Sequence, residues 1–376
     1  MDQIKTELIS TFGTLLGGED PGKFINPSAI ATDSKGNLII CDTGNHRIQK
    51  LDNAGRVLWV AGGLTTKKEP KPGTGPNEFI GPRAVCTGVD DSIYICDSIN
   101  CRVKKYDPNG KLVMMFGAQG NDEGQFGGLG PEGIDVDEKG TIFVSDGHTI
   151  RGGNHRIQAF DNWGHYLCQI GSYGISDYQF AGSVPIREYG LDFGPGIGSG
   201  PEGPIGIALQ RNPIARYFAY FRANTLFCAD TDNGRVNVLT PQGEHFGTIG
   251  KGILFRPRQI TIDSHDLLYI SDIHAHTPVW NSTNTDKEYY WQIEPNCSWV
   301  WAFNKAGQLL GRIGVPEAHH CFDHVGAGYH WHGDGIAIDK SDDQTLYIQG
   351  HNLIFKMKVD VGEVVLPKGG IPTKLG

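Results

Sequence analysis

The sequence lacks the features that are typical of membrane proteins and of zinc ribbons. No apolar run in its 376 residues is long enough to span a bilayer, and the start of the chain lacks the charged and apolar regions of a signal peptide. We therefore expect a cytoplasmic protein whose eight cysteines are reduced. No two of these cysteines form a Cys-x-x-Cys pair, which argues against a zinc ribbon or a thioredoxin-like site.

Positive charge is also scarce. The 33 lysines and arginines are outnumbered by 42 aspartates and glutamates, so the net charge is -9. This balance argues against nucleic acid as a partner, because binding along a phosphate backbone needs a basic surface. Glycine, in contrast, is abundant, with 53 copies and no collagen period, which is typical of an all-β protein with many tight turns.

A repeated unit runs through the chain. Its first copy contains Asn26-Pro-Ser-Ala-Ile-Ala-Thr-Asp33, Gly36-Asn-Leu-Ile-Ile-Cys-Asp42 and Asn45-His-Arg-Ile-Gln-Lys-Leu-Asp52, followed by a stretch from Gly55 to Gly63. Each stretch has the length and apolar pattern of a strand, and short glycine-containing turns separate several of them. The unit therefore predicts a four-stranded antiparallel meander.

Six copies of this unit predict an all-β fold, a six-bladed β-propeller that forms a single domain over residues 1–376. The last copy has no fourth strand of its own, whereas Leu8-Ile-Ser-Thr-Phe-Gly13 resembles the fourth strands of other copies. We expect this N-terminal strand to close the last blade, because closure protects the edges that an open sheet exposes. The blades are then expected at 26–63, 80–117, 130–171, 203–250, 256–314 and 332–359, the last completed by 7–14.

Long insertions fall mostly on one face of this ring, the loop-rich face. Connections between blades share that face with the turns between second and third strands, whereas the hairpins of the opposite face are mostly short, with 211–224 as the exception. Loops on a rigid scaffold often carry function, so we expect the working site at the mouth of the central channel on this face. The long segments there are 64–79, 118–129, 147–153, 172–202, 273–298 and 315–331.

The residue that begins each innermost strand should border the channel, and in four blades this residue is charged. Two arginines are expected to face each other across the ring, two carboxylates likewise, and each arginine has a carboxylate in a neighbouring blade. These residues could form structural ion pairs. Alternatively, the guanidinium groups could hold an anionic substrate while a carboxylate acts as acid or base. The four residues are Arg83, Glu132, Arg258 and Asp334.

Eight of the 14 histidines lie between residues 274 and 351. They include two His-x-His pairs in neighbouring blades, and side chains two residues apart on an extended chain point the same way. The pairs could bind one divalent metal, and imidazole ligands suit zinc, copper or iron. The alternative is a set of solvent-exposed loop histidines. The proposed metal ligands are His274, His276, His330 and His332.

Aromatic residues gather in the same two insertions, where they could line a ligand pocket or form a small core of the loops themselves. Trp331 is a candidate for substrate binding and Tyr329 for catalysis. The full candidate set is Glu132, Asp334 and Tyr329 as catalytic residues, Arg83, Arg258 and Trp331 as substrate-binding residues, and the four histidines as metal ligands.

The Asn-His-Arg-Ile runs at 45–48 and 154–157 resemble the NHL-repeat family. Among NHL-like enzymes, the peptidylglycine-amidating lyase places metal-binding histidines at inner-strand starts, with a catalytic arginine and tyrosine nearby. Here the inner-strand starts carry Arg83, Glu132 and Arg258, so a metal site would have to come from the loops. Lactonase-type propellers use an inner-strand glutamate with asparagine and aspartate around calcium. Pro131-Glu132-Gly133 is similar to that feature, but the matching asparagines are missing.

The resemblance implies a metal-assisted lyase or hydrolase that acts on a small, anionic molecule. The same family also includes interaction modules without catalytic activity that bind protein or RNA through this face. Because one fold serves both classes, the resemblance leaves the two functions open.

Overall fold

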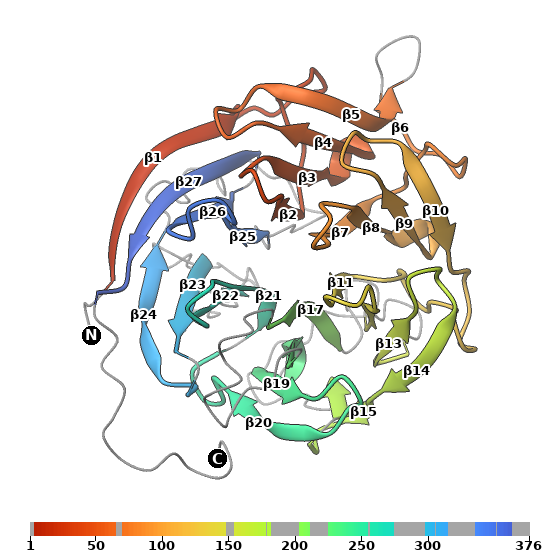
Figure 1. Ribbon diagram of the computed structural model, residues 1–376, viewed down its shortest axis with the longest axis vertical. Helices are drawn as coiled ribbons and strands as arrows, with labels where there is room; N and C mark the ends of the chain where they lie inside the picture. The colour runs from red at the N-terminus through yellow and green to blue at the C-terminus, as the bar shows by residue number, and fades with distance from the viewer. Residues whose placement is uncertain are drawn as a thin grey trace, which may run out of the picture.

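The computed structural model describes residues 4–64, 70–147, 154–177, 179–181, 203–210, 225–254, 256–273, 298–304, 306–314, 335–350 and 352–362. In these ranges the strands form six antiparallel sheets arranged around one axis (Figure 1). The predicted six-bladed β-propeller is therefore confirmed. No helix in the described ranges is long and apolar enough to cross a bilayer.

Each blade follows the chain from its innermost to its outermost strand, except that the last blade takes its outer strand from the start of the chain. Blade 1 is β2 (Ala29–Thr32), β3 (Leu38–Asp42), β4 (Arg47–Leu51) and β5 (Val57–Leu64), with the short β6 (Pro70–Lys71) at its edge. Blade 2 is β7 (Pro82–Thr87), β8 (Ile93–Asp97), β9 (Arg102–Tyr106) and β10 (Leu112–Phe116). Blade 3 is β11 (Gly133–Val136), β12 (Ile142–Asp146), β13 (Arg156–Phe160) and β14 (Tyr166–Ile170).

The second half of the ring repeats this arrangement, and β15 (Ser172–Gly174) with β16 (Gln179–Ala181) forms a small parallel pair before it. Blade 4 is β17 (Pro204–Leu209), β18 (Leu226–Asp230), β19 (Arg235–Leu239) and β20 (His245–Ile249). Blade 5 is β21 (Pro257–Ile262), β22 (Leu268–Ile273), β23 (Ser298–Phe303) and β24 (Leu309–Gly314). Blade 6 is β25 (Ile336–Ile338), β26 (Thr345–Gln349), β27 (Leu353–Asp360) and β1 (Lys5–Gly13).

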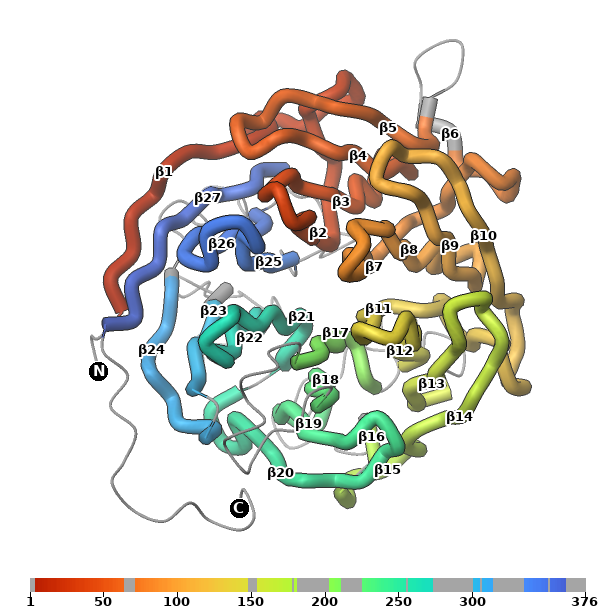
Figure 2. Tube along the Cα trace, viewed as in Figure 1, coloured from red at the N-terminus to blue at the C-terminus, as the bar shows by residue number. Residues whose placement is uncertain are grey.

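The N-terminal strand closes the ring, as the sequence predicts. β1 runs antiparallel to β27, with Lys5 opposite Asp360 and Gly13 opposite Leu353. Figure 2 shows the red start of the chain beside the blue end of the last blade. The two strands most distant in sequence thus share one sheet, and β1 covers the edge that β27 would otherwise expose.

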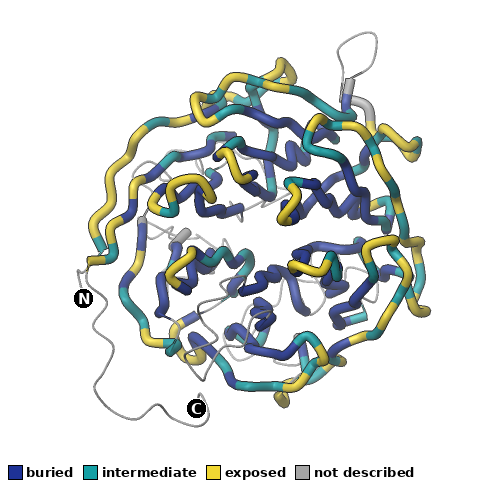
Figure 3. Tube along the Cα trace, viewed as in Figure 1, coloured by how far each residue is buried: buried dark blue, intermediate teal, exposed yellow. Residues whose placement is uncertain are grey.

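The core lies between neighbouring blades. Inner strands other than β21 are buried on both faces, and the outer strands carry most of the exposed positions (Figure 3). In β10, for example, Val113 and Met115 are exposed while their neighbours are half-buried. One apolar cluster joins Phe12 of β1 and Tyr347 of β26 to Phe24 and Leu38 of blade 1. Because such clusters join adjacent blades, closing the ring buries apolar surface that a single blade could not bury alone.

Two glycines let the inner strands approach one another. A Cβ atom at Gly133 would lie 1.8 Å from the backbone oxygen of Ile205 in the next blade. A Cβ atom at Gly206 would lie 2.0 Å from the backbone oxygen of Arg258. Since a larger residue would clash with the backbone of the next blade at both places, glycine fixes the spacing of blades 3, 4 and 5 near the axis.

Candidate functional site

A buried group of aspartate, asparagine and arginine anchors the loop-rich face. Asp42 ends β3 and accepts hydrogen bonds from Nε of Arg47 at 2.7 Å and from Nδ2 of Asn45 at 2.9 Å. The guanidinium group of Arg47 also donates to the backbone oxygens of Glu19 and Lys23, in the segment that precedes blade 1. The same three residue types recur as Asp97, Asn100 and Arg102, as Asp146, Asn154 and Arg156, and as Asp230, Asn233 and Arg235.

These groups explain why the Asn-x-Arg pattern recurs along the sequence. Arg47 and Asp42 have fully buried side chains, and burial raises the pKa of Asp42 despite the nearby guanidinium group. Removing one partner of such a pair leaves an uncompensated buried charge. His46, the residue between Asn45 and Arg47, has a structural role too. Its Nδ1 accepts a hydrogen bond from the backbone N–H of Gly81 at 3.1 Å.

Hydroxyl groups tie blades 1, 2 and 4 to the proline that opens the next blade. Oγ1 of Thr43 donates to the backbone oxygen of Pro82 at 2.7 Å. Ser98 makes the same contact with Pro131 at 2.6 Å, and Thr231 with Pro257 at 2.8 Å. The residues that follow these three prolines are the predicted channel residues, so the hydroxyl contacts fix their backbone near the axis: Arg83, Glu132 and Arg258.

The structure brings two of the predicted residues together. Nη1 of Arg83 donates to Oε1 of Glu132, and the side chains are only 9% and 4% exposed. Arg83 lies in β7, Glu132 directly precedes β11, and these inner strands of adjacent blades contact each other beside the axis (Figure 1). A guanidinium group and a carboxylate are therefore paired at the centre of the ring, and their roles in binding or catalysis stay predictions.

One further candidate lies within the described ranges. Arg258 lies in β21 of blade 5 and is half-buried. The other predicted residues lie outside the described ranges, so their assignments, including the metal site, stay predictions: Asp334, Tyr329, Trp331, His274, His276, His330 and His332.

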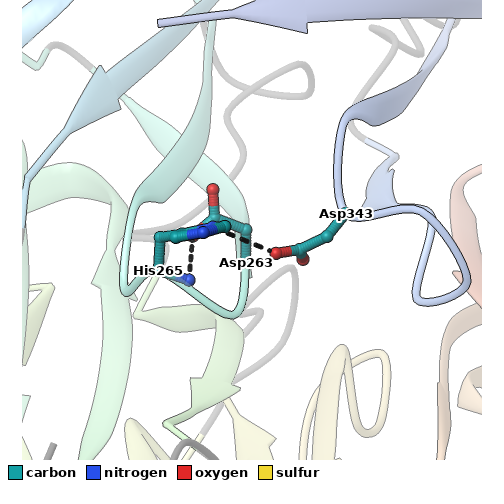
Figure 4. A group of neighbouring side chains, drawn as sticks. All are labelled: Asp263, His265 and Asp343. Atoms are coloured by element: carbon teal, nitrogen blue, oxygen red, sulfur yellow. Dashed lines mark hydrogen bonds and ion pairs between the residues drawn. The ribbon is translucent and has the colours of Figure 1, made fainter. Parts of the chain in front are cut away.

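A second group of polar side chains, which was not predicted from the sequence, lies on the face opposite the loops (Figure 4). Asp263 and His265 lie in the hairpin between β21 and β22, and Asp343 lies in the hairpin between β25 and β26. One potential ligand atom from each lies within 4.8 Å of the other two. The available signal was a lone histidine in a short hairpin, at the position where the first repeat has Lys35.

Known proteins support both the repeat and the fold. Residues 24–51, which include the first three strands of blade 1, match the family model described as NHL repeat. Over 152 residues the chain is 29% identical to Protein brain tumor of Drosophila melanogaster, which covers 40% of this chain and 13% of that protein. Over 261 residues it is 26% identical to the peptidyl-glycine alpha-amidating monooxygenase of Mus musculus, covering 64% of this chain and 23% of that protein.

A third relative is the probable peptidyl-alpha-hydroxyglycine alpha-amidating lyase pgal-1 of Caenorhabditis elegans. It is 24% identical over 143 residues, which cover 37% of this chain and 38% of that protein. The matches therefore span well under two thirds of the length of these three relatives.

A solved streptogramin B lyase has the same overall fold. Its TM-score is 0.51 at 13% sequence identity, over 95% of this chain and 98% of that chain. The matching repeat in blade 1 and the closed ring of six sheets make this chain an NHL-repeat six-bladed β-propeller.

Proposed function

We propose that this propeller is an enzyme, a lyase or hydrolase that acts on a small, anionic molecule near the axis on the loop-rich face. The observation that carries the proposal is the buried pair of Arg83 and Glu132 at the starts of adjacent inner strands. Relatives named as amidating enzymes support it, because one of them aligns with 64% of the chain.

In this proposal the arginines bind the substrate and the glutamate transfers a proton. A guanidinium group presents several N–H donors in one plane, so Arg83 and Arg258 suit the binding of a substrate carboxylate. Oε1 of Glu132 is engaged by Arg83, and among the described residues nothing donates a hydrogen bond to its Oε2. We therefore assign Oε2 as the oxygen that accepts or returns a proton.

The name of one relative, a probable peptidyl-alpha-hydroxyglycine alpha-amidating lyase, suggests a substrate to test. Peptidyl-α-hydroxyglycine ends in a carboxylate and so fits the anionic class. Breaking its N–Cα bond gives a peptide amide and glyoxylate, provided that the hydroxyl loses a proton and the departing nitrogen gains one. In the proposal, Glu132 accepts the hydroxyl proton while Arg83 and Arg258 hold the carboxylate.

A divalent metal, either zinc, copper or iron, belongs to the proposal on the sequence evidence of the two His-x-His pairs. Glu132 is the one carboxylate among the described residues at inner-strand starts, and Arg83 engages it, so these residues do not make a metal site by themselves. The ligands would be His274, His276, His330 and His332. A bound ion of this kind would polarise a substrate oxygen.

The test is release of glyoxylate from a peptidyl-α-hydroxyglycine by the purified chain, with hydrolysis of a lactone that carries a carboxylate as the second assay. Glu132→Gln should lower kcat by roughly 100-fold or more, the contribution expected of a general acid or base. Arg56→Met is the matched control, because the side chain of Arg56 is 80% exposed in a hairpin of the opposite face.

Turnover that survives Glu132→Gln unchanged would rule out the assigned catalytic role. If the wild-type chain turns over neither substrate class but retains a protein or an RNA through this face, the propeller is an interaction module and the proposal of an enzyme is wrong.

A further inference from the structure

The group on the opposite face joins two blades. Asp263 and His265 belong to blade 5, and Asp343 belongs to blade 6 (Figure 4). Asp263 is buried, Asp343 is half-buried and the His265 side chain is 76% exposed. The group is therefore open to solvent on the side of the imidazole.

The spacing suits shared coordination of a metal ion. Nδ1 of His265 lies 3.2 Å from Oδ2 of Asp343. Two ligand atoms that each lie about 2.1 Å from one ion are separated by about 3.0 to 3.4 Å when the angle between them is about 90 to 110°. The third ligand atom, from Asp263, lies within 4.8 Å of both.

Both carboxylates are oriented by backbone groups. The backbone N–H of Ser264 lies 3.0 Å from each oxygen of Asp343. Oδ1 of Asp263 accepts the backbone N–H groups of His265 and Leu267, both at 2.9 Å. The ligand oxygens therefore hold their places before any ion binds, which lowers the entropic cost of coordination.

The first two blades contain the same contact without the features of a metal site. There the backbone N–H of Ser34 donates to Oδ1 of Asp91 at 2.8 Å, and Lys35 stands where blade 5 has His265. The counterpart of Asp263 is Asp33, whose carboxylate pairs with Nζ of Lys50 at 2.8 Å.

Blade 5 has no lysine at the position that corresponds to Lys50. Lys50 lies opposite Ile39 in blade 1, and the equivalent position opposite Tyr269 in blade 5 is Ala302. Among the described residues no lysine or arginine forms an ion pair with Asp263. The seam between blades 5 and 6 thus holds negative charge that the seam between blades 1 and 2 neutralises.

We propose that Asp263, His265 and Asp343 bind a first-row divalent transition-metal ion that links blades 5 and 6. One imidazole nitrogen and two carboxylate oxygens suit Zn²⁺, Mn²⁺ or Fe²⁺, whereas Ca²⁺ and Mg²⁺ prefer oxygen ligands alone. The ion supplies the positive charge that Lys50 supplies in blade 1. It is a structural ion on the opposite face, and it does not depend on the proposed enzyme.

The test is titration of the full chain with Zn²⁺ by calorimetry after treatment with a chelator. His265→Lys reproduces the residue of blade 1 and should weaken binding at this site by roughly 100-fold or more, at least the loss that supporting residues alone can cause. His165→Ala is the matched control. His165 is equally exposed and lies 2.9 Å from Asp161, but this pair has no third ligand among the described residues.

The double variant His274→Ala/His276→Ala distinguishes the two proposed metal sites. It should still bind Zn²⁺ at the seam between blades 5 and 6. Zn²⁺ should also raise the melting temperature of this double variant, but not after His265→Lys is added to it. A wild type that binds no Zn²⁺, or a His265→Lys variant with the wild-type isotherm, overturns the proposal. Glyoxylate release tests the enzyme separately, because His265→Lys should leave it unchanged.

Discussion

Replacing Phe12 with alanine should destabilise the ring at the seam between blades 6 and 1. Phe12 lies on β1 and is 8% exposed. Its ring centroid lies 6.4 Å from that of Tyr347, and a Cβ atom at Gly55 would lie 2.6 Å from the Phe12 ring. The ring is thus held between the closing strand, the last blade and a hairpin of the first blade.

The expected loss follows from that packing. Truncating a buried phenylalanine to alanine costs about 3 to 5 kcal/mol, from lost transfer energy and the cavity left behind. We expect the lower end, about 3 kcal/mol, because β1 is an outer strand whose neighbours can relax into the space. This corresponds to a change of roughly 100-fold in the ratio of folded to unfolded protein.

Urea denaturation followed by tryptophan fluorescence measures this loss. Ile9→Ala is the control, because Ile9 lies on the same strand but is 50% exposed, and it should cost less than about 0.5 kcal/mol. Equal midpoints for Phe12→Ala and Ile9→Ala would refute the idea that β1 contributes a core residue to the closure. Deleting residues 1–13 should go further and promote aggregation, because the edge of β27 is then open.

Three further outcomes follow from the buried charges. Arg47→Met should cost about 3 to 5 kcal/mol in urea denaturation, since it leaves Asp42 buried and uncompensated; a loss below about 1 kcal/mol would contradict this. Arg83→Met should be more destabilising than Arg83→Met/Glu132→Gln, because only the single variant leaves a buried charge; equal melting temperatures would count against it. Burial lowers the pKa of His155, so protonation favours the unfolded state and stability should fall as the pH drops below about 6.5. His155→Asn, which suits the positive φ of 49° there, should show a weaker fall between pH 7 and 5 in the same denaturation assay, and an unchanged profile would contradict the assignment.

The fold was predictable because the apolar pattern repeats. The closing strand was predicted for the same reason, since Phe12-Gly13 has the form of Phe116-Gly117 and the last copy lacked that piece. The contact between Arg83 and Glu132 also follows from the repeat, because residues at the same position of adjacent blades become neighbours near the axis.

Contacts between different repeat positions were not predictable in this way. Asp263 and Asp343 are 80 residues apart and meet only when blades 5 and 6 pack together, so no local pattern connects them. The role of Arg47 was also missed, because its partners on the preceding segment are backbone oxygens, which every sequence has. A repeat reveals its period, whereas side-chain geometry decides which of its polar residues touch.

Anchoring through main-chain oxygens affects how the sequence of such a propeller can vary. Arg47, Arg102 and Arg235 hold the segments before their blades through main-chain oxygens. Because the side chains of those segments take no part in these contacts, substitutions there need no matching change in the arginine. The anchored segments can therefore vary in sequence while their attachment persists, which allows one scaffold to present different surfaces on its loop-rich face.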